Sequence, residues 1–205
     1  MPRTLMPRAT VEGLAVAQRR DAVFLPALAP FAAKDWPLVA VLPVLDINGT
    51  LASSLAARRA FGGSAPVAGI FASDPFLRVA DLAVTLRAGG ITEVVNYPTI
   101  QLFDGETAAA LGSVGYRAES EFRLLLRLAE QGLSPIACAM SQDAAEQALR
   151  LGLRRVLLHQ GLVAARRREW WAECAGHVAI EGGEALAWRA PSPAQSSRPS
   201  RRIRL

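Results

Sequence analysis

The stretch VVNYPTIQLFDG, residues 94–105, decides the fold of this chain. It begins as an apolar strand with Val94 and Val95, and then changes to amide, hydroxyl and carboxylate side chains that end at Asp104 and Gly105. A simple turn needs only one or two such residues. In parallel α/β folds the carboxyl ends of the strands share one face, and ligands bind there. We therefore interpret this segment as a strand that ends at the mouth of a ligand site.

The same change from apolar to polar residues recurs along the chain. It occurs in residues 37–48, 65–75, 133–141 and 154–161. Runs that are apolar at every position are typical of strands buried on both faces of a parallel sheet. These four segments, together with residues 90–98, are predicted to be strands, and a sixth strand is predicted near His177–Ile180.

Amphipathic segments lie between the predicted strands. Helices are predicted over residues 75–88, 118–131 and 142–151. Their apolar faces are Val79, Leu82, Ala83 and Leu86 in the first, Phe122, Leu125, Leu126 and Ala129 in the second, and Ala144, Ala145, Ala148 and Leu149 in the third. Three junctions, LRAGGITEVV, LAEQGLSPIA and LRLGLRRVLL, each end a helix, turn on a glycine and start a strand. This order predicts a βα series and an α/β fold.

The composition bounds the function classes. The chain has 205 residues and a net charge of +5, but residues 1–149 hold 12 basic and 14 acidic side chains, so the positive charge belongs to residues 150–205. A basic face for nucleic acid is therefore not expected on the main body. The two cysteines form no disulfide or zinc pattern, which suits a reducing cytoplasm. No apolar run approaches the ~20 residues of a membrane span.

Polar residues at the predicted strand ends are the candidate site. They are Asp46 and Asn48, Ser73 and Asp74, Asn96 and Thr99, Met140 and Ser141, and His159 and Gln160. Structural roles compete with functional ones: Asp74 could cap the helix at Pro75, Asp46 could cap a turn, and His159 could be a core histidine. Glu119 and Glu121 open a predicted helix, where carboxylates favour the positive end of the dipole.

Several ordered motifs resemble one known family. ASDPF, GGITEVVNYPTIQLFDG, GYRAESEFRLLLRLAEQGL and HQGL, in this order over residues 37–163, are similar to the phosphoenolpyruvate hydrolase-like TIM-barrel family of the phosphoenolpyruvate/pyruvate superfamily. The resemblance implies a (β/α)8 barrel with a small-molecule site at the strand carboxyl ends. It also implies a lyase or hydrolase acting on an oxo-acid or phospho-acid.

The superfamily resemblance suggests roles for the candidate residues. His159 and Asp74 would be catalytic, and Asp46, Asn48, Ser73, Asn96 and Thr99 would bind substrate. Mg²⁺ could be held by such oxygen ligands, since it commonly uses one or two carboxylates and substrate oxygens. No P-loop, G-x-G-x-x-G, H-E-x-x-H or G-x-S-x-G motif is present.

The chain also departs from the family pattern at both ends. Residues 1–36 have no clear counterpart of the family's glycine-rich first strand, and residues 166–205 form an arginine-rich, partly disordered tail in place of the C-H-G-G and G-A-S-S segments. We therefore expect βα units over residues 37–165 and an incomplete barrel, whose exposed sheet edges self-association would cover. An inactive barrel fragment that acts as a binding or regulatory module is the alternative to the enzyme. A third reading, in which Arg166–Arg168 with Trp170 and Trp171 touch nucleic acid or membrane, is weaker, because charge blocks are usually solvated tails.

Overall fold

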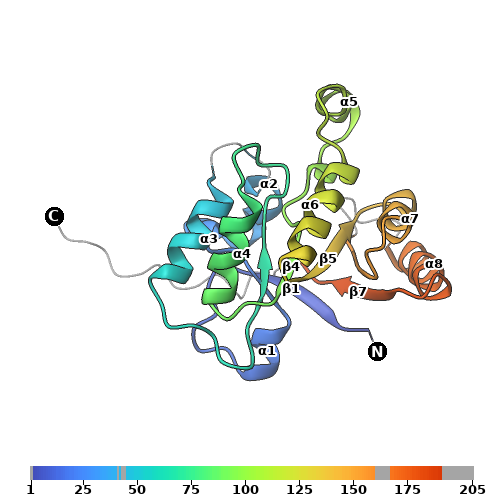
Figure 1. Cartoon of the computed structure of the whole chain (residues 1–205). Coiled ribbons are helices and arrows are strands. Elements are labelled where there is room, and N and C mark those ends of the chain that lie inside the picture. Colours follow the sequence, from blue (N-terminus) through green and yellow to red (C-terminus); the bar gives the residue numbers. More distant parts are fainter. Residues whose placement is uncertain (1, 41, 43–44, 160–166, 191–205) are drawn as a thin grey trace.

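Seven parallel strands close into a barrel within the part of the chain that the computed structural model describes, residues 2–40, 42, 45–159 and 167–190 (Figure 1). The strands are β1 (Thr4–Arg8), β2 (Ala22–Phe24), β3 (Val67–Gly69), β4 (Glu93–Val95), β5 (Ser134–Ala139), β6 (Arg155–Leu158) and β7 (Glu184–Trp188). Each strand pairs with the next along the chain, and β7 closes the barrel on β1, with Leu5 opposite Trp188. The TIM-barrel-type α/β fold is confirmed, with one strand fewer than the usual eight among the described residues.

Helices surround the barrel. The α-helices are α1 (Val16–Arg20), α2 (Trp36–Val39), α3 (Ile47–Ala56), α4 (Val79–Ala88), α5 (Gly105–Ser113), α6 (Ala118–Glu130), α7 (Gln142–Arg150) and α8 (Arg167–Ile180). Short 3-10 turns are η1 (Pro26–Leu28), η2 (Ala33–Asp35) and η3 (Ile100–Leu102). Helices α3, α4, α6, α7 and α8 pack against one another in this order, so they form a continuous outer layer.

Two apolar clusters hold the layers together. Inward-facing strand residues fill the barrel, and they are Leu5, Val23, Val67, Val95, Ile136, Cys138, Leu157 and Leu186. The alternate strand residues, such as Ala68, Val94 and Val156, face outward and pack against the helices. This alternation is what a strand imposes when both of its faces are buried. The interior of the barrel is therefore a packed core and not a channel for a ligand.

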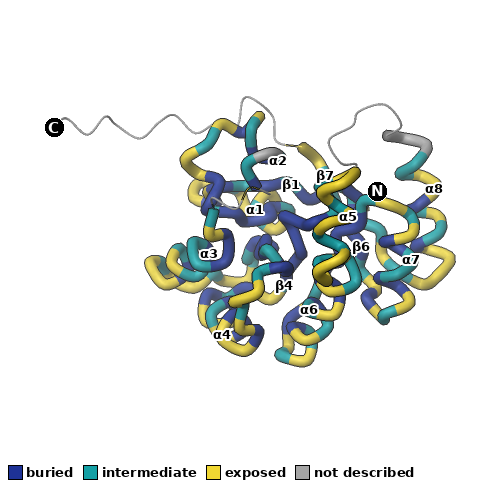
Figure 2. Tube along the Cα trace, turned by 90° about the horizontal axis from the view of Figure 1, so that it is seen from above, coloured by how far each residue is buried: buried dark blue, intermediate teal, exposed yellow. Residues whose placement is uncertain are grey.

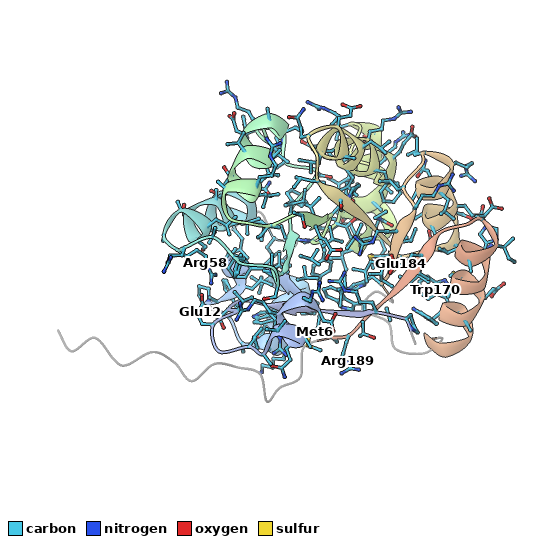
Figure 3. All side chains as sticks on the ribbon, turned by 60° about the horizontal axis from the view of Figure 1, so that its bottom comes forward. Met6, Glu12, Arg58, Trp170, Glu184 and Arg189 are labelled. Carbon is cyan, nitrogen blue, oxygen red and sulfur yellow. The ribbon has the colours of Figure 1, made fainter. Side chains whose placement is uncertain are left out.

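The outer layer is thin over β1, against which no described helix packs extensively. Met6 of β1 and Arg189, which follows β7, both line a cavity of about 290 Å³ on this wall (Figure 3). Helix α1 reaches the same cavity but has no buried residue. No described helix covers this part of the barrel wall as the long helices cover the rest.

Most of the predicted elements are confirmed. Strands lie within four of the predicted segments, as β3, β4, β5 and β6, and the helices of the βα series are α4, α6 and α7. The apolar faces predicted for α4 and α7 are buried as expected. In α6 the buried face is rotated, because Glu121 and Leu128 are buried whereas Leu126 and Ala129 are only half-buried.

The strand predicted at residues 37–48 is wrong. Helix α2 covers its beginning, and Asp46 caps α3 by accepting a hydrogen bond from the backbone nitrogen of Gly49 at 2.8 Å. A short apolar run cannot distinguish a buried strand from a buried helix by periodicity alone. The strand that precedes this region is β2, within the segment 1–36 that we interpreted as divergent, and that segment also holds β1.

The predictions for the carboxyl-terminal part also need correction. Residues 177–180 lie in α8, and the strand follows the turn at Gly182 as β7. Residues 167–188 are therefore part of the barrel and not a tail, and the closure of β7 on β1 removes the free sheet edge that we expected. Of the predicted tail, residues 191–205 and Arg166 lie outside the described residues, as does the candidate site residue Gln160.

We expect Gly90→Ala to lower the free energy of unfolding by about 2 kcal/mol. Gly90 has a φ of 78°, and an added Cβ would lie 2.3 Å from the carbonyl oxygen of Phe61. The matched control is Gly152→Ala, which has a φ of 97° but no heavy atom within 4 Å of the added Cβ, so only backbone strain of about 1 kcal/mol applies. Urea denaturation of both variants checks the difference, and equal losses would contradict the close approach of Phe61.

Candidate functional site

An aromatic layer lies inside the barrel at the carboxyl ends of the strands. It consists of Tyr97, His159 and Trp188, which follow β4, follow β6 and end β7. The ring centroids of Tyr97 and His159 are 5.2 Å apart with nearly parallel planes, and Trp188 lies 4.4 Å from Tyr97 and 4.8 Å from His159. Tyr97 and His159 are buried, whereas Trp188 is half-buried. Trp188 is therefore the ring of this layer that a ligand reaches most easily.

Burial sets the protonation of this layer. Desolvation lowers the pKa of His159 from 6.5 to about 4, so its imidazole is neutral near pH 7. Desolvation, together with the nearby thiol of Cys138, raises the pKa of Tyr97, so its phenol stays protonated. The protonated phenol of Tyr97 can then act as a neutral hydrogen-bond donor to a ligand oxygen.

The carboxylate of Glu121, fully buried in the first turn of α6, is the centre of a polar network. Oε1 accepts hydrogen bonds from Ser73 Oγ at 3.0 Å and from the backbone nitrogen of Ile100 at 3.1 Å. Oε2 accepts from Asn96 Nδ2 at 2.8 Å and from Thr99 Oγ1 at 2.5 Å. The network thus joins the loop after β3, the loop after β4 and the start of α6.

Two effects act on the pKa of Glu121 in opposite directions. Complete burial raises it, and this is the larger effect. The four donors, from Thr99, Ile100, Asn96 and Ser73, lower it by stabilising the charged form. No arginine, lysine or histidine bonds to this carboxylate in the described residues. A carboxylate held only by neutral donors is a positioning element for two loops.

The same loop is fastened to β5. Asn96 Oδ1 accepts a hydrogen bond from the backbone nitrogen of Cys138 at 2.7 Å. Gln101 Nε2 donates to the carbonyl oxygen of Cys138 at 2.8 Å, and its Oε1 accepts from the backbone nitrogen of Met140 at 3.2 Å. The polar groups of residues 94–105 therefore bond mainly to protein, which answers why this strand end carries so many of them.

Asn48 and Asp74 form a second, separate pair. Asn48, buried in the first turn of α3, donates to Asp74 Oδ2 and to the carbonyl oxygen of Phe71, each at 3.0 Å, and accepts from the backbone nitrogen of Phe71 at 3.1 Å. Asp74 Oδ1 accepts from the backbone nitrogen of Phe76 at 2.9 Å, so Asp74 caps a turn. The helix that we expected to begin at Pro75 begins at Val79.

The predicted site residues thus lie in three separate groups, apart from Asp46, which caps a helix at the surface. Ser73, Asn96 and Thr99 meet at Glu121, Asn48 meets Asp74, and His159 lies in the aromatic layer. Asp46 is exposed and caps α3. No group of three or more histidine, cysteine or acidic side chains among the described residues is arranged to hold a metal ion. We therefore assign no ligand set to Mg²⁺.

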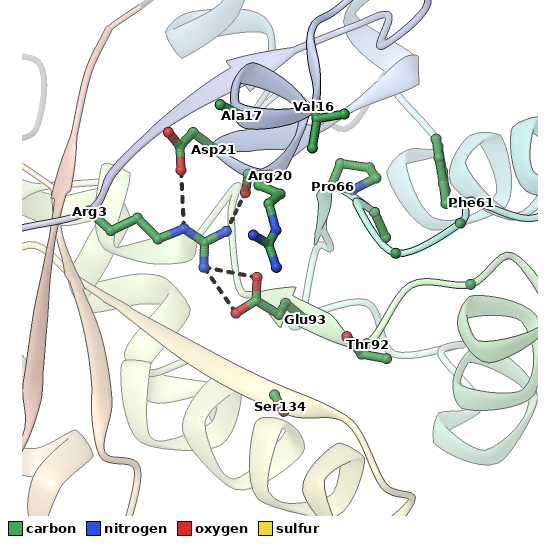
Figure 4. Close-up of a pocket in the computed structure, with 14 residues that line it drawn as sticks. Arg3, Val16, Ala17, Arg20, Asp21, Phe61, Pro66, Thr92, Glu93 and Ser134 are labelled. Atoms are coloured by element: carbon green, nitrogen blue, oxygen red, sulfur yellow. Dashed lines mark hydrogen bonds and ion pairs between the residues drawn. The ribbon is translucent and has the colours of Figure 1, made fainter.

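Two cavities lie at opposite ends of the barrel. One of about 390 Å³ opens at the carboxyl end, between the strand-end residues Gln101, Met140 and Ser141 and the helix α7. A larger one of about 880 Å³ lies at the amino end, where Arg3 donates to both oxygens of Glu93 and to Asp21 (Figure 4).

The charges around the amino-end cavity balance one another. Arg155 also bonds to Glu93 and to Glu184, so the carboxylates are already paired. The guanidinium groups are Arg3, Arg20 and Arg155, and the carboxylates are Asp21, Glu93 and Glu184. A charge-balanced cluster at the amino end of a barrel, whose three carboxylates are all paired with Arg3 or Arg155, indicates a role in stability.

Sequence reasoning gave Glu121 only a role at the positive end of the helix dipole, and it did not propose Gln101, Tyr97 or Trp188 as site residues. A signal for Glu121 was available, because Glu121, Leu125 and Leu128 share one face at the spacing i, i+4, i+7. An acidic residue on the apolar face of a helix indicates a buried carboxylate. Trp188 gave no such signal, since β7 was not predicted.

The sequence of this chain matches one known protein family. The profile of the family described as phosphoenolpyruvate hydrolase-like matches residues 38–172, well over half of the chain. The chain belongs to this family. The matched stretch contains Glu121, Asn96 and His159, whereas Trp188 lies beyond it.

Relatives add little about activity. Residues of this chain are 36% identical over 126 positions to the bacterial "Uncharacterized protein y4oT" of Sinorhizobium fredii (strain NBRC 101917 / NGR234), a match of 62% of this chain and 61% of that protein. They are 30% identical over 101 positions to the tomato (Solanum lycopersicum) "ToMV resistance protein Tm-1(GCR237)" and "ToMV susceptible protein tm-1(GCR26)", 49% of this chain and 13% of each. The match thus spans less than two thirds of each relative.

No described helix has the length and apolar character needed to cross a membrane.

Proposed function

We propose that this chain binds a small oxo-acid or phospho-acid at the carboxyl end of the barrel, against the aromatic layer of Tyr97, His159 and Trp188. The observation that carries the proposal is the layer itself, which combines the half-buried indole of Trp188 with the neutral imidazole of His159 and the protonated phenol of Tyr97. A flat conjugated acid can stack on Trp188 while its oxygens accept hydrogen bonds. The family described as phosphoenolpyruvate hydrolase-like supports an acid of this class.

Binding without catalysis is the form of this function that the geometry favours. The carboxylate oxygens of Glu121 and Asp74 already accept hydrogen bonds from the protein, and Glu121 is fully buried. A general acid or base must instead be within reach of the reacting proton. The chain would then be a binding or regulatory member of its family.

A lyase or hydrolase is the second candidate, and one observation favours it. His159, whose imidazole is neutral near pH 7, and the half-buried Asp74 both lie at the carboxyl ends of the strands, where barrel enzymes place their catalytic groups. This candidate predicts release of pyruvate and phosphate from phosphoenolpyruvate and water. Loss of that activity in His159→Gln, with an unchanged melting temperature, would support catalysis over binding alone.

We expect one acid from a panel of oxo-acids and phospho-acids, measured with and without Mg²⁺, to raise the melting temperature by about 5 °C at a hundredfold excess over its Kd. Trp188→Leu should remove most of this rise, because it removes the accessible ring. Trp170→Leu, which alters a half-buried tryptophan on α8, is the matched control and should keep it. A panel in which no acid changes the melting temperature would contradict the proposal.

A further inference from the structure

Helix α5 projects beyond the carboxyl ends of the strands and stands apart from the barrel (Figure 1). It has no buried residue, and most of its length is exposed (Figure 2). No other described helix or strand packs extensively against it. A free helix of this length is only marginally stable in water, so tertiary or quaternary contacts must supply most of its stability.

The free side of α5 is uncharged along its centre. Ala108, Leu111 and Gly112 are half-buried against the chain's own loop, whereas Ala109, Ala110 and Ser113 are exposed. Val114, directly after the helix, is 69% exposed. Small side chains permit another helix to approach closely, and an exposed valine at the end of the helix offers an apolar contact.

We propose that α5 is a dimerisation arm, which pairs antiparallel with α5 of a second copy of this chain about a twofold axis near Ala109. Such an isologous contact needs a surface that is complementary to itself. The opposite charges of Glu106 and Arg117, at the two ends of α5, meet this requirement.

Acidic and basic groups lie at opposite ends of the arm. Glu106 lies in the first turn, and the guanidinium of Arg117 donates to the carbonyl oxygen of Gly112 at 2.9 Å, which places it at the last turn. Among the described residues neither Glu106 nor Arg117 forms an ion pair within its own chain. Antiparallel pairing brings Glu106 of each copy to the end that carries Arg117 of the other, and it also opposes the two helix dipoles favourably.

A pair of nine-residue helices is too small for a tight dimer, since stable interfaces usually bury about 1,200–2,000 Å². Further apolar surface is exposed at the same end of the barrel. Phe76, in the loop after β3, is 89% exposed, and Leu42, between β2 and α3, is 48% exposed. The arm with these loops predicts a dimer of moderate affinity.

Sedimentation velocity over about a hundredfold range of protein concentration tests the arm. We expect a reversible monomer–dimer equilibrium. Val114→Asp should weaken it at least about tenfold, because antiparallel pairing brings residue 114 of each copy to the end of the other helix that carries Asp104 and Glu106, and these carboxylates repel the new one. Val84→Asp, at a valine on α4 that is 58% exposed, is the matched control and should leave the equilibrium unchanged.

Charge reversal tests the antiparallel pairing. Glu106→Arg and Arg117→Glu should each weaken association about tenfold, and the double variant should restore it, because the two ion pairs are rebuilt with reversed sign. A chain that stays monomeric at every concentration would overturn the proposal. A dimer that ignores all the α5 variants, or a double variant no better than the single ones, would overturn it as well.

Discussion

We expect Glu121→Gln to lower the free energy of unfolding by about 3 kcal/mol. The carboxylate accepts four hydrogen bonds from groups that can donate. An amide replaces one acceptor oxygen with a donor, so at least one buried donor, such as the Asn96 amide or the Ile100 backbone nitrogen, faces a second donor. The loops after β3 and β4 lose their common anchor at the same time.

The matched control lies one half-turn away on α6. Glu119 opens the same helix but is accessible to solvent, and it pairs with Arg123 at 2.6 Å. Glu119→Gln should cost no more than about 0.5 kcal/mol. Urea denaturation of both variants gives the comparison, and similar losses for the two would mean that the network at Glu121 does not hold the loops.

We expect protonation of His159 alone to lower the free energy of unfolding by about 3 kcal/mol when the pH falls from 7 to 4. The pKa of His159 is lowered from 6.5 to about 4 by burial. Between these values the unfolded chain binds more protons than the folded chain, so stability falls as the pH falls. Below about pH 4 the folded imidazole is also protonated, and the loss levels off.

A variant isolates this contribution from those of other groups. His159→Phe keeps an aromatic ring in the layer but cannot titrate, so the difference in stability between wild type and variant should change by about 3 kcal/mol between pH 7 and pH 4. Chemical denaturation at several pH values measures it. The comparison with the variant is needed because burial raises the pKa of Glu121, so this group makes the free energy of unfolding rise, and not fall, as the pH falls. Parallel curves for the two proteins would show that His159 is not a buried neutral imidazole.

Sequence patterns predicted the middle of the barrel well for a physical reason. In residues 65–158 each strand has a buried apolar run, α4, α6 and α7 each bury one largely apolar face, and glycines at positive φ follow these helices, as at Gly90, Gly132 and Gly152. Local preference and tertiary burial agree there. The family motifs lie in the same region, so the resemblance and the patterns reinforced one another.

The ends of the barrel were harder to predict. β2 has three residues, and α2 and α8 show no apolar face that a helical period would reveal. The closure of β7 on β1 joins the two ends of the described chain, and no local pattern encodes such a contact. Tertiary pairing decides these elements, which is why an open barrel and a long tail were predicted wrongly.

The candidate site was predicted in part for a similar reason. The rule that polar strand ends share one face placed Asn96, Thr99, Ser73 and His159 together at the carboxyl end of the barrel, where the structure has them. It could not tell which of these side chains bond to protein and which face a ligand. Ser73, Asn96 and Thr99 bond to a buried carboxylate, and the aromatic layer that we propose as the ligand surface depends on Trp188, at the end of an unpredicted strand.

Calorimetric titration of the acid that most raises the melting temperature tests whether this acid binds at the aromatic layer. The titrations compare wild type with Trp188→Leu, at the carboxyl end, and with Arg20→Gln, whose side chain lines the amino-end cavity. We predict saturable one-site binding to wild type, an unchanged Kd for Arg20→Gln and a Kd at least about tenfold weaker for Trp188→Leu. Binding that Arg20→Gln abolishes and Trp188→Leu preserves would place the ligand at the opposite end of the barrel and contradict the account.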